Sequence, residues 1–357
     1  MSKDRKDLFC GCLVGGAVGD ALGYFVEFLR WKEIEKKYGK EGIQDLDSDK
    51  GFRKAVISDD TQMTLFTAEG LLHGKNAEVP AEGTIFDRYI PCIWDSYKDW
   101  YDTQRMSLEG YDGRSWLCTI PALNRRRAPG LTCLDALSNA EYTLSTDPVN
   151  NSKGCGGVMR VAPIGLYFNP EKLDSKTPMD LIDMMGAEAS AVTHGHPLGY
   201  IPSAAFVHMI NRLVYPQNGP VNNLAEVVME ATEYVTELYG DKAEITLFHE
   251  LMNRAVALAG QEIADRDAIK KLGEGWVAEE ALAIAVFSAV RYQDDFRKAI
   301  QCAVNHDGDS DSTGAIAGNI LGAYLGYEGI RHSFKLKRLE LLSVIKEMAG
   351  LLYQASL

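Results

Sequence analysis

The sequence predicts an all-α fold, and three observations support this. Apolar residues return at i, i+3, i+4 and i+7 in many segments, which is the pattern of one buried helix face. Alternating apolar and polar runs of strand length are nearly absent. Several segments also carry small residues at helical spacing.

Helical periodicity is clear in six segments: 61–72, 203–215, 224–239, 278–290, 313–326 and 339–352. The N-terminal segment 1–28 has a basic start and an apolar stretch, but Asp20 and five glycines interrupt it before a membrane-spanning length is reached. We therefore expect a buried helix rich in small residues, in a cytoplasmic protein.

Two of these helices carry glycines four residues apart on one face. They are Gly15, Gly19 and Gly23 in the first helix, and Gly314, Gly318 and Gly322 near the end of the chain. Each glycine costs about 1 kcal/mol of helix propensity relative to alanine, so a compensating role is expected. The simplest such role is close packing between helices.

Composition sets limits on the organisation and the partners of the chain. The 357 residues contain no linker, low-complexity run or fixed repeat, so we predict one domain over 1–357. A net charge of −13 argues against general binding to nucleic acid or to an anionic membrane. Seven cysteines without paired C-x-x-C spacing indicate reduced thiols, and "HELMN" at 249–253 lacks the second histidine of a zinc-protease motif.

The stretch "NHDGDSDSTGAIAGN" at 305–319 places three aspartates at every second position. Asp307, Asp309 and Asp311 match positions 1, 3 and 5 of a calcium-binding EF-hand loop. Ser312 stands where that loop needs glycine, and Gly318 where it needs a bidentate glutamate, so an EF-hand is excluded. Alternatively, the acids form the start of the following helix, with Asp311 or Ser312 as the N-cap.

A helix start needs only one capping residue, and this one has several acids. The extra acids are either part of a solvated acidic cap or oxygen ligands for a hard cation. "SDDT" at 58–61 repeats the design at the start of another amphipathic helix. If the two helix starts face each other, four carboxylates and several hydroxyls are available for two divalent ions, which lie about 3.5–4 Å apart in binuclear hydrolytic sites.

Six motifs together resemble the ADP-ribosylglycohydrolase family. In order, they are "GDALGYFVEF", "SDDTQMTLFTAEGLL", "SKGCGGVMRVAPIGL", "THGHP", "GWVAEEALAIAV" and "GDSDSTGAIAGNILGA", and the resemblance runs from about residue 9 to residue 326. It implies a compact all-α fold with two Mg²⁺ or Mn²⁺ ions in a cleft, and removal of ADP-ribose from modified side chains.

The resemblance also implies roles for particular residues. The implied metal ligands are Ser58, Asp59, Asp60, Asp309, Asp311 and Ser312. Asp60 and Asp309 are implied to be catalytic as well, together with Glu27, which would contact the distal ribose or act as acid or base. Without the resemblance, Glu27 would be interpreted as a surface residue, and Asp20 as either a supporting acid or a buried structural one.

The glycine-rich loop is implied to wrap the diphosphate of the substrate. Its residues are Gly154, Cys155, Gly156, Gly157, Val158 and Met159, and the glycines allow backbone N–H groups to approach phosphate oxygens. His194 is either a cleft residue or a structural histidine, and Trp276 either stacks on adenine or belongs to the core. Arg160 either pairs with phosphate or supports the loop by bonding to a carboxylate, and we expect the second. We expect Arg125–Arg127 to form a solvated turn.

These residues predict a metal-dependent hydrolase that releases ADP-ribose from a modified protein, with arginine as the first acceptor to consider. O-acetyl-ADP-ribose, ADP-ribosyl-serine, modified nucleic acid and poly(ADP-ribose) remain alternative substrates. Two other classes also remain open: an immunity protein that counteracts a cognate ADP-ribosyltransferase toxin, and a binding protein without turnover, although both metal motifs are intact.

Overall fold

The structure is a computed structural model that describes residues 4–46, 53–78, 83–105, 113–216, 219 and 221–356. In this part of the chain the structure has helices and no β-strand, only two isolated bridges, so the all-α prediction is confirmed. The α-helices are α1 (Arg5–Gly23), α2 (Trp31–Tyr38), α3 (Asp59–Asn76), α4 (Ile85–Gln104), α5 (Leu131–Leu137), α6 (Ala162–Tyr167), α7 (Pro178–Ala191), α8 (Pro197–Val214), α9 (Leu224–Leu238), α10 (Ile245–Ala259), α11 (Asp265–Ile269), α12 (Ala278–Arg291), α13 (Phe296–Val304), α14 (Ser310–Ile330) and α15 (Leu342–Ser356). The 3-10 turns are η1 (Leu117–Thr119), η2 (Val158–Arg160), η3 (Pro170–Lys172) and η4 (Leu336–Arg338).

The six periodic segments correspond to α3, α8, α9, α12, α14 and α15, with small differences at the ends. The largest difference is at α8, which begins six residues before the predicted segment. Residues 339–341 precede α15, and Leu341 there has a left-handed backbone with φ of 56°. Among the described residues, none of the helices is both long and apolar enough to cross a membrane.

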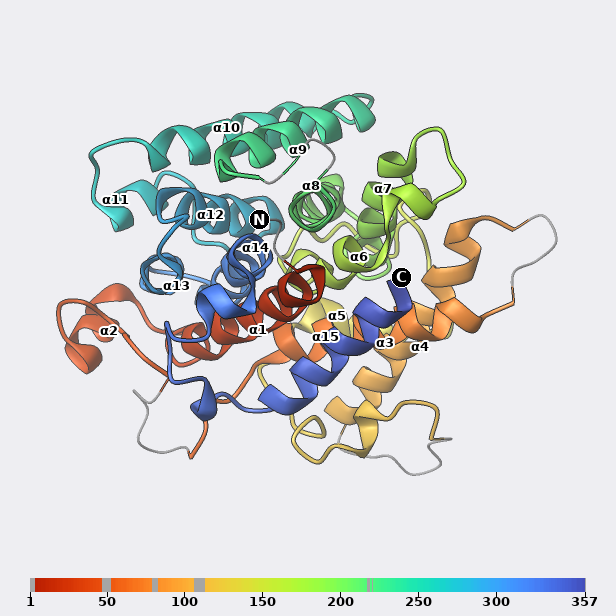
Figure 1. Cartoon of the computed structure of the whole chain (residues 1–357), viewed down its shortest axis with the longest axis horizontal. Helices are drawn as coiled ribbons and strands as arrows, with labels where there is room; N and C mark the ends of the chain where they lie inside the picture. Colours follow the sequence, from red (N-terminus) through yellow and green to blue (C-terminus); the bar gives the residue numbers. More distant parts are fainter. Residues whose placement is uncertain are drawn as a thin grey trace.

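Helices α1 and α14 lie side by side at the centre of the fold, although they come from opposite ends of the chain (Figure 1). A Cβ atom placed on Gly19 would lie 1.9 Å from the carbonyl oxygen of Gly314, and one on Gly15 would lie 2.3 Å from that of Gly318. The two backbones are therefore in direct contact. The packing role predicted for the glycines is confirmed.

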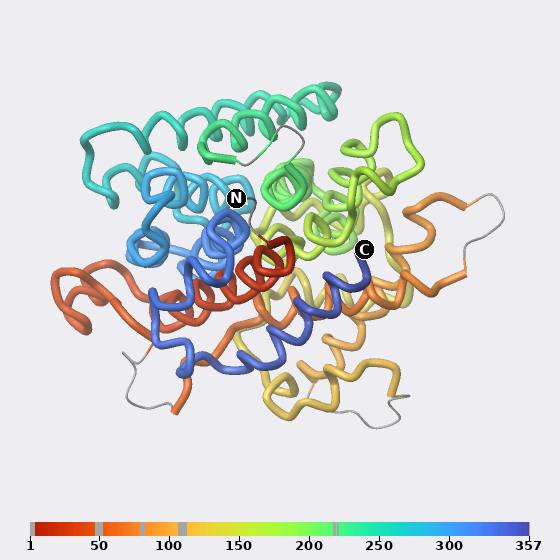
Figure 2. The backbone as a smooth tube through the Cα atoms, in the orientation of Figure 1, coloured from red at the N-terminus to blue at the C-terminus, as the bar shows by residue number. Residues whose placement is uncertain are grey.

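The pairing is antiparallel, because Gly11 faces Gly322 whereas Gly23 faces Ser310. Consequently the C-terminal end of α1 lies beside the N-terminal end of α14. Helices α12 and α13 pack against α14, and α15 packs against α1 and α3. The tube view shows the remaining helices around this central pair, with α9 and α10 along one edge (Figure 2).

Candidate active site

The two acidic motifs form the first turns of α3 and α14. Ser58 is the N-cap of α3, and its hydroxyl accepts a hydrogen bond from the Asp60 backbone N–H at 3.2 Å. Asp309 is the N-cap of α14 and accepts from the Ser312 N–H at 3.2 Å. The prediction that Asp311 or Ser312 caps this helix is therefore wrong, since the helix begins one residue earlier than Asp311.

Asp20 joins α1 to the start of α3. Its fully buried carboxylate accepts hydrogen bonds from the backbone N–H groups of Ser58, at 2.9 Å, and Thr61, at 3.1 Å, and from the Thr61 hydroxyl. These N–H groups have no partner within the helix, so an acid supplied from α1 satisfies them. Burial raises the pKa of Asp20 to about 6, although the hydrogen bond from Thr61 opposes the shift. Asp20 therefore fixes the position of the first acidic motif.

Glu27 lies just beyond α1 and is only 8% exposed, so its interpretation as a surface residue is wrong. Burial, followed by the neighbouring carboxylates of Asp309 and Asp59, raises the pKa of Glu27 to about 9. A hydrogen bond with Asp311 lowers the pKa in part. Glu27 thus belongs to the same electrostatic cluster as both acidic motifs.

Two further acids of the cluster, Asp60 and Asp311, show the same effect. Burial, followed by Asp20 and Asp59, raises the pKa of Asp60 well above its ordinary value. Burial, followed by Asp60 and Glu27, does the same for the pKa of Asp311. Carboxylates that penalise one another's ionisation in this way mark a place where protons or cations are strongly favoured. The structure therefore brings the two helix starts together, as the sequence analysis required.

The chemistry of this cluster fits divalent cations. Asp60 Oδ2 is buried and has no hydrogen-bond partner among the described residues, and carboxylate and hydroxyl oxygens are the ligands that Mg²⁺ and Mn²⁺ prefer. As the side chains are placed, no three acidic, histidine or cysteine residues in the described ranges are close enough to enclose one ion.

Asp307, the remaining aspartate of the second motif, has a different task. Its carboxylate accepts a hydrogen bond from the backbone N–H of Trp31 at 2.7 Å and so fixes the start of α2. Gly308 then turns the chain with φ of 134°, where a Cβ atom would lie 1.9 Å from the Glu274 carbonyl oxygen. Of the three alternating aspartates, Asp307 therefore makes a structural contact, whereas Asp309 and Asp311 belong to the acidic cluster.

The glycine-rich loop lies against the second motif. The Cys155 thiol donates a hydrogen bond to Asp309 Oδ2 at 2.8 Å, and its backbone N–H donates to the Trp276 carbonyl at 3.2 Å. Burial, followed by Asp309, raises the pKa of Cys155 well above its ordinary value. The side chain is therefore a neutral thiol and a poor nucleophile. Val158 and Met159 are buried, so only their backbone atoms could meet a ligand.

The loop glycines are also required by internal packing. A Cβ atom on Gly157 would lie 1.9 Å from the Ser190 hydroxyl, and one on Gly156 would lie 3.0 Å from Cε1 of His194. A Cβ atom on Gly154 would make a looser contact with the same histidine, at 3.3 Å from Nε2. Internal packing therefore favours glycine at these positions even without a bound phosphate. Contact between the loop and a phosphate stays a prediction.

His194 and Arg160 are buried residues next to the glycine-rich loop. His194 is buried, its Nδ1 lies 2.8 Å from the Thr193 hydroxyl, and burial followed by Arg160 lowers its pKa to about 3, so the ring is neutral. Arg160 is fully buried and donates to the Ala189 carbonyl and the Thr193 hydroxyl, with its guanidinium 4.1 Å from the centre of the Tyr97 ring. The expected support is present, but these partners replace the carboxylate that we predicted.

Trp276 is 40% exposed, so it is not a core residue. Its ring stacks on Phe28, with centroids 6.4 Å apart and planes 21° apart, and Phe28 is itself 70% exposed. Sequence analysis missed Phe28, although its position directly after Glu27 was a usable signal. The salt bridge between Arg30 and Glu274, at 2.6 Å, joins the same two segments, so the aromatic pair forms part of the rim beside Glu27.

The basic turn after residue 124 also contacts the cluster. The Arg127 carbonyl accepts from the Asp59 N–H at 3.0 Å, and the Gly130 N–H donates to Asp59 Oδ2 at 3.2 Å. Arg127 also pairs with Glu340 at 3.3 Å, so the solvated turn predicted for the arginine triplet is wrong at this residue. Between these contacts Ala128 adopts φ of 53°, an uncommon and strained conformation for a residue other than glycine.

Comparison with known proteins gives a consistent result. The sequence profile of the ADP-ribosylglycohydrolase family matches residues 1–356. The chain belongs to this family. It is 23% identical to the ADP-ribosyl-[dinitrogen reductase] glycohydrolase of Rhodospirillum rubrum, over 91% of this chain and 87% of that protein. It is also 23% identical to the human ADP-ribosylhydrolase ARH3, over 92% of this chain and 88% of that protein.

A solved structure described as an ADP-ribosylglycohydrolase-related protein complex superimposes with a TM-score of 0.58 at 22% identity, covering all of both chains. This match supports the helical fold. As a member of this family, the protein is an enzyme that hydrolyses conjugates of ADP-ribose.

Proposed function

We propose that this enzyme removes ADP-ribose from a modified protein side chain with the help of two divalent cations, and that arginine is the acceptor. The observation that carries the proposal is the convergence of the starts of α3 and α14 with Glu27. Glycosidic bonds break through a cation-like transition state at the anomeric carbon, and flanking carboxyl groups supply acid, base or charge stabilisation.

The six oxygen-bearing residues of the two motifs would hold the cations. They are Ser58, Asp59, Asp60, Asp309, Asp311 and Ser312. When bound, divalent ions would orient ribose hydroxyls and increase the acidity of a coordinated water. Asp20 keeps Ser58 and the first turn of α3 in place, and the Cys155 thiol restrains Asp309.

Glu27 has two compatible roles at this point. A buried carboxyl group can protonate a leaving group as a general acid when it holds its proton, which burial and the neighbouring carboxylates favour and bound cations would oppose. The same group can instead hydrogen-bond to the distal ribose. Both roles place the bond to be broken beside Glu27 and Asp309, whose carboxylates lie within electrostatic range of each other.

The rim of the site supports arginine as the acceptor. Phe28 and Trp276 present aromatic surface directly beside the acidic cluster. A guanidinium group is attracted both by ring faces and by nearby carboxylates, whereas an anionic nucleic-acid acceptor would be repelled. Glycines 154, 156 and 157 would then lie along the diphosphate, on the other side of the ribose.

Incubation with arginine-, serine- and DNA-linked ADP-ribose and with O-acetyl-ADP-ribose, with and without EDTA, tests this proposal. We expect fastest release from arginine, loss of activity in EDTA, and binding of about two Mn²⁺ per chain by calorimetry. Asp60→Asn should abolish turnover and weaken Mn²⁺ binding. The matched variant Asp307→Asn should keep Mn²⁺ binding, because that carboxylate contacts Trp31. Full activity in excess EDTA would refute the metal role, and preference for another conjugate would refute the acceptor.

A further inference from the structure

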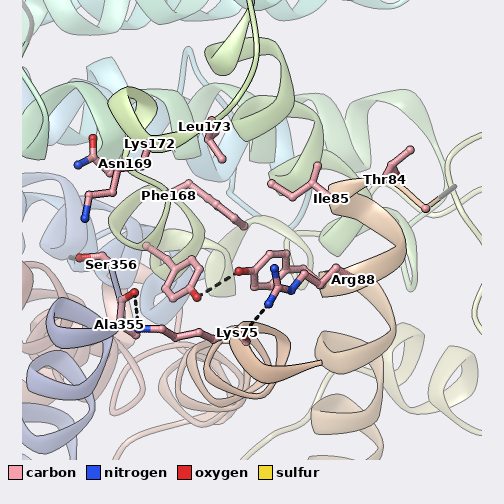
Figure 3. Close-up of a pocket in the computed structure, with 13 residues that line it drawn as sticks. Lys75, Thr84, Ile85, Arg88, Phe168, Asn169, Lys172, Leu173, Ala355 and Ser356 are labelled. Carbon is pink, nitrogen blue, oxygen red and sulfur yellow. Dashed lines mark hydrogen bonds between the residues drawn. The ribbon is translucent and has the colours of Figure 1, made fainter. Parts of the chain in front are cut away.

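A cavity of about 540 Å³ lies at the opposite end of α3 from the acidic cluster. Figure 3 shows the residues that line it. Lys75 follows Asp60 by 15 residues in the same helix, so a rise of 1.5 Å per residue separates them by about 22 Å. The last turn of α3, the first turns of α4, the segment 167–173 and the end of α15 form its walls. The cavity is therefore distinct from the proposed active site.

The side chains around this cavity are cationic, aromatic or neutral. Three of them carry positive charge, Lys75, Arg88 and Lys172, and none of the lining residues that the structure describes is acidic. This is unusual in a chain with 50 acidic and 37 basic residues. Three cations from three separate elements at one concave surface favour an anion.

Two of these cations also stabilise helix ends. Lys75 Nζ donates to the Ala355 carbonyl at 3.0 Å, and Arg88 donates through Nε to the Gly74 carbonyl at 2.7 Å and through Nη2 to the Lys75 carbonyl. Helix C-termini favour cations, which explains these contacts. The Nη1 group of Arg88 takes no part in these hydrogen bonds, and the Lys172 ammonium has no hydrogen-bond partner in the described ranges. Both donors are therefore available to a ligand.

Three described acids close to the cavity in sequence do not contribute to its lining. Asp87 lies at the start of α4, but its carboxylate accepts from the Thr84 N–H at 2.7 Å and the Thr84 hydroxyl at 2.8 Å. Glu171 and Asp174 are close to Lys172 in sequence and exposed, and neither lines the cavity.

The inner wall of the cavity is largely apolar. Phe168 packs edge-to-face against Tyr89 and Tyr167, with centroid distances of 5.0 Å for both pairs, and the two tyrosine hydroxyls are 3.2 Å apart. Ile85 and Leu173 are partly exposed above these rings, and Figure 3 shows both on the side opposite Lys75. An apolar or aromatic group would bury this surface while an anionic group met the cations.

We propose that this cavity is a second binding site for a small organic phosphate of nucleotide size, separate from the hydrolytic site. Its volume lies within the roughly 300–1,000 Å³ of small-molecule sites. The phosphate lies among Arg88, Lys75 and Lys172, and the ring or apolar part contacts Ile85 and Leu173. Asn169, which is 7% exposed and lines the cavity, provides a neutral side-chain amide at its edge.

Calorimetric titration of the full chain with AMP and, separately, inorganic phosphate tests the proposal. We expect saturable AMP binding, tighter than that of phosphate, which Lys172→Glu weakens about tenfold or more because a charged contact becomes repulsive. Lys176→Glu is the matched control, since this exposed lysine lies outside the cavity, and it should change binding less than about twofold. Hydrolysis of ADP-ribose conjugates should be unchanged in both variants.

Three results would overturn the second site. The first is absence of saturable AMP binding to the wild-type chain. The second is an equal effect of both substitutions, which would indicate general surface charge. The third is AMP binding that Lys172→Glu leaves intact, which would place the ligand in the hydrolytic cleft.

Discussion

The contact between α1 and α14 gives a direct test of the fold. Gly19→Ala places a methyl group 1.9 Å from the Gly314 carbonyl oxygen and 2.2 Å from its carbonyl carbon. Ordinary contacts at a Cβ atom begin at 3.4 Å, so the two helices must separate locally by about 1.5 Å. Both contacting groups are backbone, so no side-chain rotation can relieve the overlap.

Two opposing effects set the size of the loss. Replacing a helical glycine by alanine gains about 1 kcal/mol of helix propensity, whereas overpacking a well-packed interior costs about 1–3 kcal/mol and occasionally more. The overlap at Gly19 is severe and cannot relax, so we expect the upper end of that cost and a net loss of about 2 kcal/mol in the free energy of unfolding. Gly314 is close in sequence to Asp311 and Ser312, so turnover should fall as well.

Gly350→Ala is the matched control. Gly350 lies within α15, and a Cβ atom placed on it would meet no neighbouring group within 4 Å, so only the propensity gain of about 1 kcal/mol applies. Urea denaturation followed by helical circular dichroism should therefore give changes of opposite sign in the two variants. If the Gly19→Ala variant had the same free energy of unfolding as the Gly350→Ala variant, the direct backbone contact would be refuted.

Three further predictions concern individual side chains. Glu27→Gln should lower turnover of ADP-ribosyl-arginine by about 10²–10⁴-fold with Mn²⁺ binding retained, and near-normal turnover would remove Glu27 from the catalytic set. Cys155→Ser should keep activity within about threefold, because a hydroxyl can still donate to Asp309; an inactive but folded variant would instead indicate thiol chemistry. Glu69 is buried, accepts a hydrogen bond from the Ser115 hydroxyl at 2.6 Å, and has its pKa raised by burial from 4.5 to about 7. Because the folded state holds this proton more tightly, the stabilisation is complete below pH 4.5 and is lost as pH rises through 7; at about 1.36 kcal/mol per pKa unit it is on the order of 3 kcal/mol. Glu69→Gln should flatten that dependence in urea denaturation at pH 5 and pH 8, and an unchanged slope would contradict the assignment.

The sequence by itself determined the features that depend on neighbouring residues in the chain. Helical periodicity identified α3, α8, α9, α12 and α14, because a turn of 3.6 residues is a local property. The glycine spacing indicated close helix packing for the same reason. The paired acidic motifs were recognisable because two helix starts carried more acids than capping requires.

Tertiary structure alone decided which partner each polar side chain has. Asp307 contacts Trp31, which precedes it by 276 residues, and Glu27 is buried because the starts of α3 and α14 pack beside it. Phe28, just after α1, stacks on Trp276, which precedes α12 in a distant part of the chain. Burial and partner choice arise from contacts between segments that are distant in sequence, so no local pattern specifies them.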